Sequence, residues 1–380
     1  MAACSNTPAE QNPSSSAQPS QVKVALLQSF KASADLSIDW WVRLDPEHLS
    51  LYQRQMAHHL HLALIWKHLI LPLPTGRVMA LNRETGDFVW DIPLNGRISY
   101  GVVTHKHRGF IGTEQGQIIA FDGRLGTTVW QTTLSSSVSA INAYDSAILA
   151  RSVDGKVYRI DPDTGRIRWV NTQPLPPLTL HGSSQPLMIN QQVIFGSDSG
   201  DLLHLNASSG EIEHRINLGR SRGYSDIDNL FDIQATPLYF QGLLYVSAWA
   251  SALLAYNPAT QFIQWENDQP SYQALRLNDN EQLLALTQQG KLVGINPQSG
   301  ETLWSQNALV NRKPNALIHQ DRWLVTSDRW GVMHWFTQTG DIAARYLAQY
   351  PWAMNGVSQQ QQLFFLNQAG EVIALSISAR

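Results

Sequence analysis

Short apolar runs alternate with turn residues along most of this chain, and one such unit recurs. The stretch GQIIAFDGRLGTTVW, Gly116–Trp130, predicts a strand, a tight turn at Gly126 and a second strand. The same pattern occurs at Gly76–Trp90, Gly155–Trp169 and Gly290–Trp304, with the second glycine ten residues after the first and the tryptophan four further on. Repetition this regular determines the architecture.

The spacing of the glycine-anchored strand predicts the fold. Less regular copies begin at Gly200, Ser251, Gly331 and Gly370, so eight copies follow one another at steps of 39 to 51 residues. Two further apolar runs lie between each outer strand of the repeat and the next copy. A period near 40 residues with four short strands per unit is typical of propeller blades. We therefore expect an all-β protein, an eight-bladed β-propeller with four-stranded antiparallel blades.

The two ends of the chain predict how the ring closes. The last copy, Gly370–Ile377, has no tryptophan-bearing strand after it, whereas Ile38–Leu44, with Trp41, is such a strand without a glycine-anchored partner. Pairing these two strands would complete the eighth blade and remove two open sheet edges. We expect the N-terminal strand, at about 38–44, to close the ring, and residues 38–380 to form a single propeller.

The tryptophans indicate packing between blades. Six of them stand at equivalent positions of the repeat: Trp41, Trp90, Trp130, Trp169, Trp265 and Trp304. Burial of an indole between two sheets is worth on the order of a few kcal/mol, so we expect each to lie between adjacent blades. The repeat fails at His214 and Ala344, which replace a tryptophan, and at Gln261, which replaces the turn glycine. Gln261 should be strained if its φ is positive.

The N-terminus resembles the end of a bacterial lipoprotein signal. Cys4, the only cysteine, follows small residues and precedes a segment rich in Ser, Pro, Gln and Asn. We expect lipid attachment at Cys4 and assign residues 1–37 to a lipoprotein N-terminus and flexible tether; the alternative is an incidental cysteine. Elsewhere no apolar run reaches the roughly 18 residues of a spanning helix.

Composition and motifs exclude several function classes. A formal net charge of -3 gives no electrostatic reason to expect nucleic acid. Serine-hydrolase, zinc-protease and phosphate-loop motifs are missing from the sequence. The histidines at His58–His68 have no carboxylate or cysteine nearby, and the aspartates at Asp226–Asp232 lack the EF-hand spacing. We therefore expect no metal, no cofactor and no catalytic residues.

Two segments break the blade period, and both follow the outer strand of a blade directly. They are Val170–Ser183 and Asn217–Gln234, in consecutive blades. Connections of one type emerge from one face of a propeller, so the two should lie side by side. The first carries Leu175, Leu178 and Leu180, and the second carries Arg220, Arg222, Asp226, Asp228 and Asp232. An apolar centre beside a charged rim is typical of a protein interface; the alternative is variation in loop length without a function.

The blade motif resembles the quinoprotein-dehydrogenase-type propeller repeat. PLPPLTLHGSSQP (174–186), SDIDNLFDIQATP (225–237) and Cys4 are also similar to the BamB family, lipoprotein subunits of the outer-membrane β-barrel assembly machine. The likeness covers roughly Ile38 to Arg380. It implies a propeller without catalytic activity, monomeric within the complex. It also implies a lipid anchor in the outer membrane of a Gram-negative bacterium and an orientation towards the periplasm.

The resemblance also implies a partner. The family binds BamA through the POTRA domains, and unfolded β-barrel precursors could be additional partners by strand addition. The partner-binding residues implied here are Leu178, Leu180, His181, Gly182, Asp228, Asp232 and Gln234. His181 replaces the arginine of the family's Leu-x-Leu-Arg-Gly loop. Asp232 keeps the first of two acidic positions in the neighbouring loop, and Gln234 replaces the second. We expect the same partner face with altered polar contacts.

Two other functions stay open. A PQQ-dependent dehydrogenase shares the repeat, but its chemistry needs a quinone, usually calcium with carboxylate ligands, and a catalytic aspartate. The chain has few long insertions and no convergent acidic set, which disfavours that enzyme. The other alternative is an interaction propeller with a different periplasmic partner.

Overall fold

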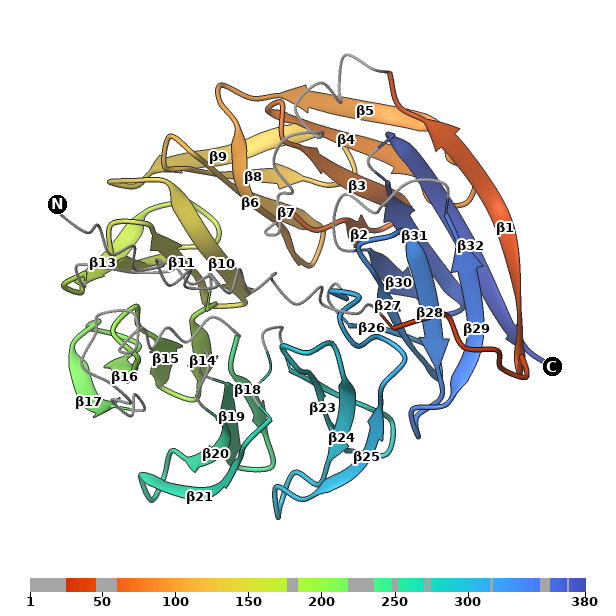
Figure 1. Cartoon of the computed structure of the whole chain (residues 1–380). Helices are drawn as coiled ribbons and strands as arrows, with labels where there is room; N and C mark the ends of the chain where they lie inside the picture. The colour runs from red at the N-terminus through yellow and green to blue at the C-terminus, as the bar shows by residue number, and fades with distance from the viewer. Residues whose placement is uncertain are drawn as a thin grey trace, which may run out of the picture.

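The computed structural model describes residues 25–45, 60–175, 184–217, 236–247, 252–269, 271, 275–314, 317–348, 356–367 and 369–380. Within these ranges the chain forms eight four-stranded sheets and no helix. The sheets are antiparallel and stand around a central axis as the blades of a propeller (Figure 1). The predicted eight-bladed β-propeller is therefore confirmed.

In seven of the eight blades the strands follow chain order from the centre of the ring outward, and the eighth blade takes its outer strand from the N-terminus (Figure 1). Blade one is β2 (Ala63–Ile65), β3 (His68–Leu73), β4 (Arg77–Asn82) and β5 (Phe88–Pro93). Blade two is β6 (Ile98–His105), β7 (Arg108–Thr113), β8 (Gln117–Asp122) and β9 (Thr127–Thr133). Blade three is β10 (Val138–Tyr144), β11 (Ala147–Ser152), β12 (Lys156–Ile160) and β13 (Ile167–Thr172). Blade four is β14 (Leu187–Ile189), β15 (Gln192–Gly196), β16 (Asp201–Asn206) and β17 (Ile212–Asn217).

The second half of the ring follows the same order. Blade five is β18 (Leu238–Phe240), β19 (Leu243–Ser247), β20 (Leu253–Asn257) and β21 (Phe262–Asn267). Blade six is β22 (Arg276–Leu277), β23 (Leu283–Leu286), β24 (Leu292–Ile295) and β25 (Thr302–Gln306). Blade seven is β26 (Ile318–Gln320), β27 (Trp323–Ser327), β28 (Val332–Phe336) and β29 (Ile342–Leu347). Blade eight is β30 (Val357–Gln359), β31 (Gln362–Leu366), β32 (Glu371–Ala379) and, from the other end of the chain, β1 (Ala34–Arg43).

The middle strands of the blades are buried on both faces. Every residue of β3, β11, β19 and β27 is buried, whereas the outer strand β17 is mostly exposed. Blades cover one another's faces, so a middle strand is buried and mostly apolar along its whole length, without an alternating pattern. The core is therefore a series of layers between the blades.

The N-terminal strand closes the ring. β1 pairs antiparallel with β32 from Ala34 opposite Ala379 to Arg43 opposite Glu371. The closure predicted from the two incomplete copies is confirmed. The strand begins at Ala34, four residues before the predicted start, because residues 34–37 continue the ladder along β32.

One tryptophan was assigned wrongly. Trp40, not Trp41, is the inter-blade residue of β1: its indole Nε1 donates to the carbonyl oxygen of Arg83 in blade one at 2.9 Å. Trp41 is 61% exposed. Trp40 lies opposite Ala374 after a bulge, as Trp90 lies opposite Ala80 beside a bulge. The extra residue of a bulge reverses which side chain points inward, and spacing alone does not locate it in a Trp-Trp pair.

The tryptophan and the turn glycine of the repeat form one contact across two blades. A Cβ atom placed on Gly126, whose φ is +69°, would lie 2.5 Å from the indole of Trp90 in the preceding blade. The same contact at 2.5–2.7 Å joins Gly86 to Trp40, Gly165 to Trp130, Gly210 to Trp169, Gly300 to Trp265 and Gly340 to Trp304. The predicted packing between blades is thereby confirmed for Trp90, Trp130, Trp169, Trp265 and Trp304, and only glycine fits beside these rings.

In blade seven the tryptophan lies on the third strand of the blade instead of the fourth. Ala344 of β29 lies opposite Trp335 of β28, the reverse of the Trp90–Ala80 pair. Trp335 is fully buried, and its indole nitrogen donates to Oε1 of Gln320 at 2.8 Å. A large and a small residue have exchanged strands, so the total volume between the two strands is kept.

Candidate partner-binding site

The two segments that break the repeat each connect the outer strand of one blade to the inner strand of the next. The first loop, residues 176–183, lies between β13 and β14, and the second loop, residues 218–235, lies between β17 and β18. Leu178, Leu180, His181, Gly182, Asp228, Asp232 and Gln234 therefore lie outside the described residues, as does Cys4. The structure describes the base on which both loops stand.

Both loops leave from the same face of the ring. Gln173, just before the first loop, donates its backbone N–H to the carbonyl of Gly155, in the turn between β11 and β12, at 3.0 Å. Asn217, the last residue before the second loop, is opposite Asp201, next to the turn between β15 and β16. We call the face that carries these turns between second and third strands the upper face. The loops therefore start on the upper face in consecutive blades.

A network of polar side chains joins the two segments of the chain that lead into the first and second loops. Arg215 donates through Nη1 to Oδ2 of Asp201 at 2.8 Å and through Nη2 to Oε1 of Gln173 at 3.0 Å. Asn217 donates to the other oxygen of Asp201 at 2.7 Å. Gln173 and Asp201 are buried, and hydrogen bonds to charged groups are stronger than neutral ones. Arg215 therefore fixes the start of the second loop to the start of the first.

A buried ion pair holds the chain where the first loop returns. Arg151 donates through Nη2 to Oδ1 of Asp198 at 3.2 Å, and both side chains are almost fully buried. Its Nη1 donates to the carbonyls of Ser184 at 3.3 Å and Gly196 at 3.0 Å. The guanidinium also lies 5.5 Å from the ring centre of Phe195. Removing one partner would leave a buried charge unpaired, which is strongly destabilising, so Ser184 is held firmly in place.

The returning ends of the two loops are joined as well. The backbone N–H of Gln185 donates to Oγ1 of Thr236 at 3.4 Å, and its side-chain amide donates to the hydroxyl of Tyr100 in blade two. Burial raises the pKa of Tyr100 to about 12, so the phenol stays protonated even at alkaline pH. Gln185 thus connects blade two, the first loop and the second loop. Both starts and both ends of the loops are therefore cross-linked by hydrogen bonds.

Sequence reasoning missed the residues of this base. One signal was present: Arg151 ends the apolar run AILAR of β11, a strand buried on both faces. A charge in such a strand needs a buried partner. Its partner Asp198 is 47 residues away in sequence, and nothing local distinguishes it from other turn aspartates.

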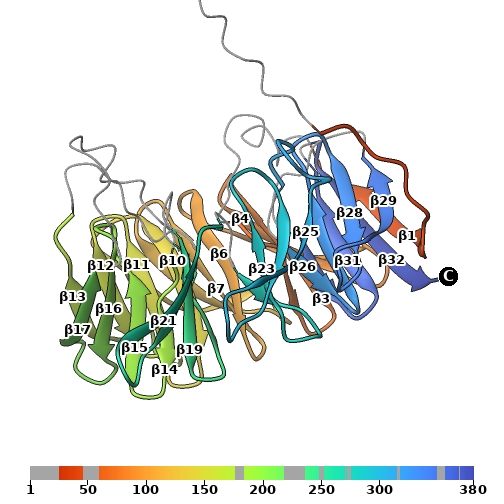
Figure 2. The same ribbon diagram turned by 60° about the horizontal axis from the view of Figure 1, so that its bottom comes forward.

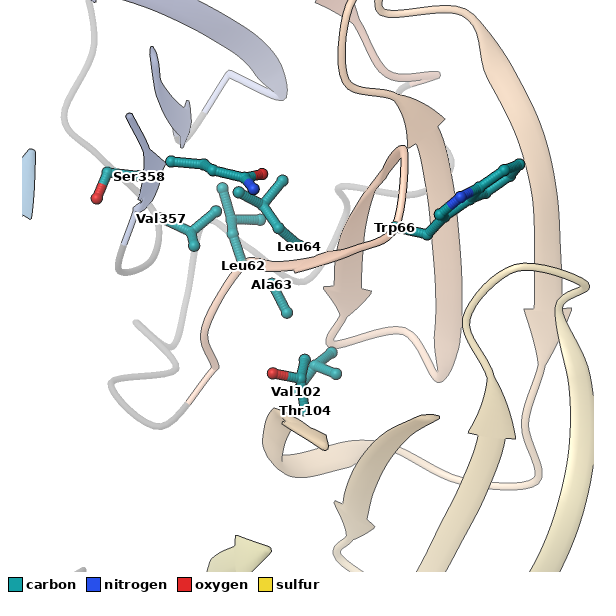
Figure 3. A pocket seen from close by; sticks show the side chains of 9 residues that line it. Leu62, Ala63, Leu64, Trp66, Val102, Thr104, Val357 and Ser358 are labelled. Atoms are coloured by element: carbon teal, nitrogen blue, oxygen red, sulfur yellow. The ribbon is translucent and has the colours of Figure 1, made fainter. Parts of the chain in front are cut away.

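A separate hollow of about 420 Å³ lies between the inner strands of blades eight, one and two (Figure 3). It is lined by Leu62, Ala63, Leu64, Trp66, Val102, Thr104, Val357, Ser358 and Gln359. In Figure 3, Leu62, Leu64 and Val357 turn toward one another and Trp66 stands apart. This lining offers apolar surface with a few hydroxyl and amide groups. Across the described ranges, no three His, Cys, Asp or Glu side chains gather as they would around a metal ion, and no helix is long and apolar enough to span a bilayer.

The chain matches the family described as outer membrane protein assembly factor BamB over residues 74–306 and 242–378. A relative of that name from Yersinia pestis is 25% identical over 286 residues, which are 72% of each chain. Another, from Alteromonas naphthalenivorans, is 27% identical over 292 residues, covering 71% of this chain and 69% of the relative. A third, from Alkalilimnicola ehrlichii, is 30% identical over 205 residues, which are 53% of each chain.

Solved structures share the fold. The crystal structure of BamB from Moraxella catarrhalis has a TM-score of 0.77 and 22% identity, covering 90% of this chain and all of that one. Quinohemoprotein alcohol dehydrogenase ADHIIG from Pseudomonas putida HK5 has a TM-score of 0.62 and 10% identity, covering 90% of this chain and 76% of that one. One fold thus serves an enzyme and an assembly factor, so the fold does not separate them. The family model matches most of the chain, so the resemblance to the BamB family is confirmed, and the chain belongs to the outer membrane protein assembly factor BamB family.

Proposed function

We propose that this protein is a non-enzymatic scaffold subunit of the outer-membrane protein assembly machine. It binds the POTRA domains of BamA through the first and second loops and assists the insertion of β-barrel proteins. The observation that carries the proposal is the cross-linked base, in which Arg215 and Gln185 tie the two loops together on one face. Because a fixed base limits the ordering cost of binding, such loops suit a docking surface.

The loops divide the contact between them. Leu178 and Leu180 are the proposed apolar anchors, with Gly182 beside them in the same loop. His181 stands where the family has an arginine, so we expect a polar contact there rather than a fixed charge. Asp228, Asp232 and Gln234 in the second loop form the polar rim. Truncating a central apolar anchor usually costs more binding free energy than truncating a residue of the rim. Most of the affinity should therefore come from the first loop.

The scaffold acts at the membrane through a lipid on Cys4. We place it on the periplasmic side of the outer membrane of a Gram-negative bacterium, as a monomer within the complex. Relatives named outer membrane protein assembly factors support this location. Contact with unfolded β-barrel precursors would be an additional role. Labelling with a radioactive fatty acid tests the anchor: wild type should incorporate it and Cys4→Ser should not.

A pull-down with the isolated POTRA domains of BamA tests the binding face. Leu178→Ala/Leu180→Ala should weaken binding by at least about tenfold, since each anchor contributes more than about 1 kcal/mol. The matched control is Leu125→Ala/Leu347→Ala, which removes two leucines that are 66% and 65% exposed elsewhere on the ring. Equal binding by the two double mutants would refute the proposed face.

The absence of catalysis is tested separately. Purified protein supplied with PQQ and calcium should not reduce an electron-acceptor dye in the presence of alcohols. Turnover that depends on added quinone would overturn the proposal in favour of the dehydrogenase.

A further inference from the structure

The chain before β1 crosses the edge of blade seven. We call residues 25–33 the strap. At its start the N–H of Ala25 donates to the carbonyl of Val310, in the connection between β25 and β26, and at its end the N–H of Ser33 donates to the carbonyl of Ala343; both bonds are 3.0 Å. Val310 is on the upper face and Ala343 is near the opposite end of β29. The strap therefore runs along the outer edge of blade seven, from the upper face to the opposite face, as the red trace before β1 shows (Figure 2).

Two arginines hold the strap against the blade. Arg312 donates through Nη1 to the carbonyl of Ala25 at 2.9 Å, and Arg345 donates through Nη1 to the carbonyl of Gln28 at 2.9 Å. The guanidinium of Arg345 also lies over the ring of Phe30, 4.9 Å from its centre. Charge-assisted hydrogen bonds and a cation–π contact thus add to the two backbone bonds.

The two arginines are themselves positioned by a buried pair. Arg312 contacts the carboxylate of Asp328, and Nε of Arg345 donates to Nδ1 of His334 at 3.4 Å. The other ring nitrogen of His334 lies 3.3 Å from Oδ2 of Asp328, and both residues are fully buried. Burial lowers the pKa of His334, which keeps the ring neutral. A neutral ring that accepts at Nδ1 carries its proton on Nε2 and donates it to Asp328.

We infer that the docked strap determines where the N-terminal segment leaves the propeller. With the strap in place, residues 1–24 leave at Ala25, on the upper face that carries the first and second loops. Without docking they would leave at Ala34, where β1 starts near the opposite face. The consequence rests on the proposed lipid at Cys4: the anchor then pulls the upper face, and with it the partner-binding loops, towards the membrane.

Hydrogen exchange on the full-length lipidated protein tests the docking. The amides of Ala25 and Ser33, which donate to blade carbonyls, should be protected in the wild type. Phe30→Ser, which changes the strap and no blade, and Arg345→Gln should each raise their exchange by about tenfold or more, as expected for loss of one charge-assisted contact. Leu26→Ser is the matched control, because Leu26 is 82% exposed on the same segment. Rapid exchange in the wild type, or no change in Phe30→Ser, would overturn the inference.

Energy transfer to acceptor lipids in vesicles tests the orientation. A fluorophore is placed by Glu114→Cys on the upper face or by Leu125→Cys on the opposite face of the same blade. Transfer should be more efficient from position 114 than from 125, and Phe30→Ser should remove the difference. Equal transfer from both positions in protein with a protected strap would refute the inferred orientation. Failure of the protein to associate with vesicles would instead refute the lipid anchor, while hydrogen exchange still decides whether the strap docks.

Discussion

The junction between blades one and two differs from the junction between blades four and five. In the first, the indole of Trp90 leaves no room for a side chain on Gly126. In the second, His214 stands in place of the tryptophan and Gln261 in place of the glycine. Gln261 keeps a positive φ of 61°, and its amide nitrogen is 3.2 Å from Nε2 of His214. The tryptophan and the glycine are thus lost together, because a smaller ring in one blade makes room for a side chain in the next.

The junction between blades four and five also contains a buried ionisable group. His214 lies opposite His204, where Trp90 lies opposite Ala80. His204 is fully buried, and its ring centre is 5.6 Å from that of Tyr256 in blade five. Burial lowers the pKa of His204 to about 4, with a smaller contribution from the charge of His214. His214 stands on β17, the strand that leads into the second loop.

The two adjacent tryptophans of β1 provide the strongest contrast at a regular junction. Trp40→Ala should lower the free energy of unfolding by about 3 kcal/mol, because it empties the space against Gly86 and breaks the bond to Arg83. Trp41→Ala should change it by less than about 0.5 kcal/mol, since that side chain is largely exposed. Urea denaturation measures both. Equal losses would mean that the bulge does not select Trp40.

Adding a methyl group to the turn glycine tests the contact between blades one and two from the side of blade two. Gly126→Ala should cost about 2–3 kcal/mol, because its Cβ would overlap Trp90 and its φ is positive. Gln261→Ala should cost less than about 1 kcal/mol, since that position already holds a Cβ at positive φ. Denaturation midpoints compare the two. Equal costs for the two substitutions would mean that neither the indole of Trp90 nor the positive φ excludes a side chain at position 126.

Acid should destabilise the protein through the junction between blades four and five. The pKa of His204 is depressed in the folded protein, so the unfolded chain binds a proton that the folded one does not. The stability present above about pH 6.5 is therefore lost as the pH falls towards 4, by on the order of 2–3 kcal/mol. Stability curves at pH 7.0, 5.5 and 4.5 measure this, and His204→Gln should remove that part of the loss. An identical pH dependence in wild type and His204→Gln would contradict it.

Restoring the missing tryptophan should be harmful alone and tolerated with its glycine. His214→Trp should destabilise the ring by about 1–2 kcal/mol, because the indole would meet the Gln261 side chain. Adding Gln261→Gly should recover at least about 1 kcal/mol, measured as the coupling energy of a double-mutant cycle. Additive effects would show that the two positions are independent.

Much of the fold could be predicted from the sequence. Blade number, strand order and ring closure followed from the copies of the Gly116–Trp130 unit and from the strand left over at Ile38–Leu44. Blade number and strand order depend on residues within about forty positions of one another, and ring closure depends on the two incomplete copies at the ends of the chain. The candidate loops could be located only as places where the period fails, and their contacts stay predictions.

The base beneath the loops could not be predicted in the same way. Arg151 pairs with Asp198, and Arg215 reaches Gln173, across two blades and more than forty residues. Many turn aspartates have the same local sequence features, so the choice of partner depends on which blades become neighbours. The same holds for the strap, where Arg345 meets Gln28 from the far end of the chain.

The sequence by itself determined the repeat, and through it the number of blades and the closure of the ring. This is because the alternation of apolar residues and the turn glycines act locally. The tertiary structure alone decided that Trp40 rather than Trp41 turns inward, that Gln261 is tolerated beside His214, and which charges are buried together. Those outcomes depend on the volume and charge that one blade presents to the next, and no spacing within a single blade contains that information.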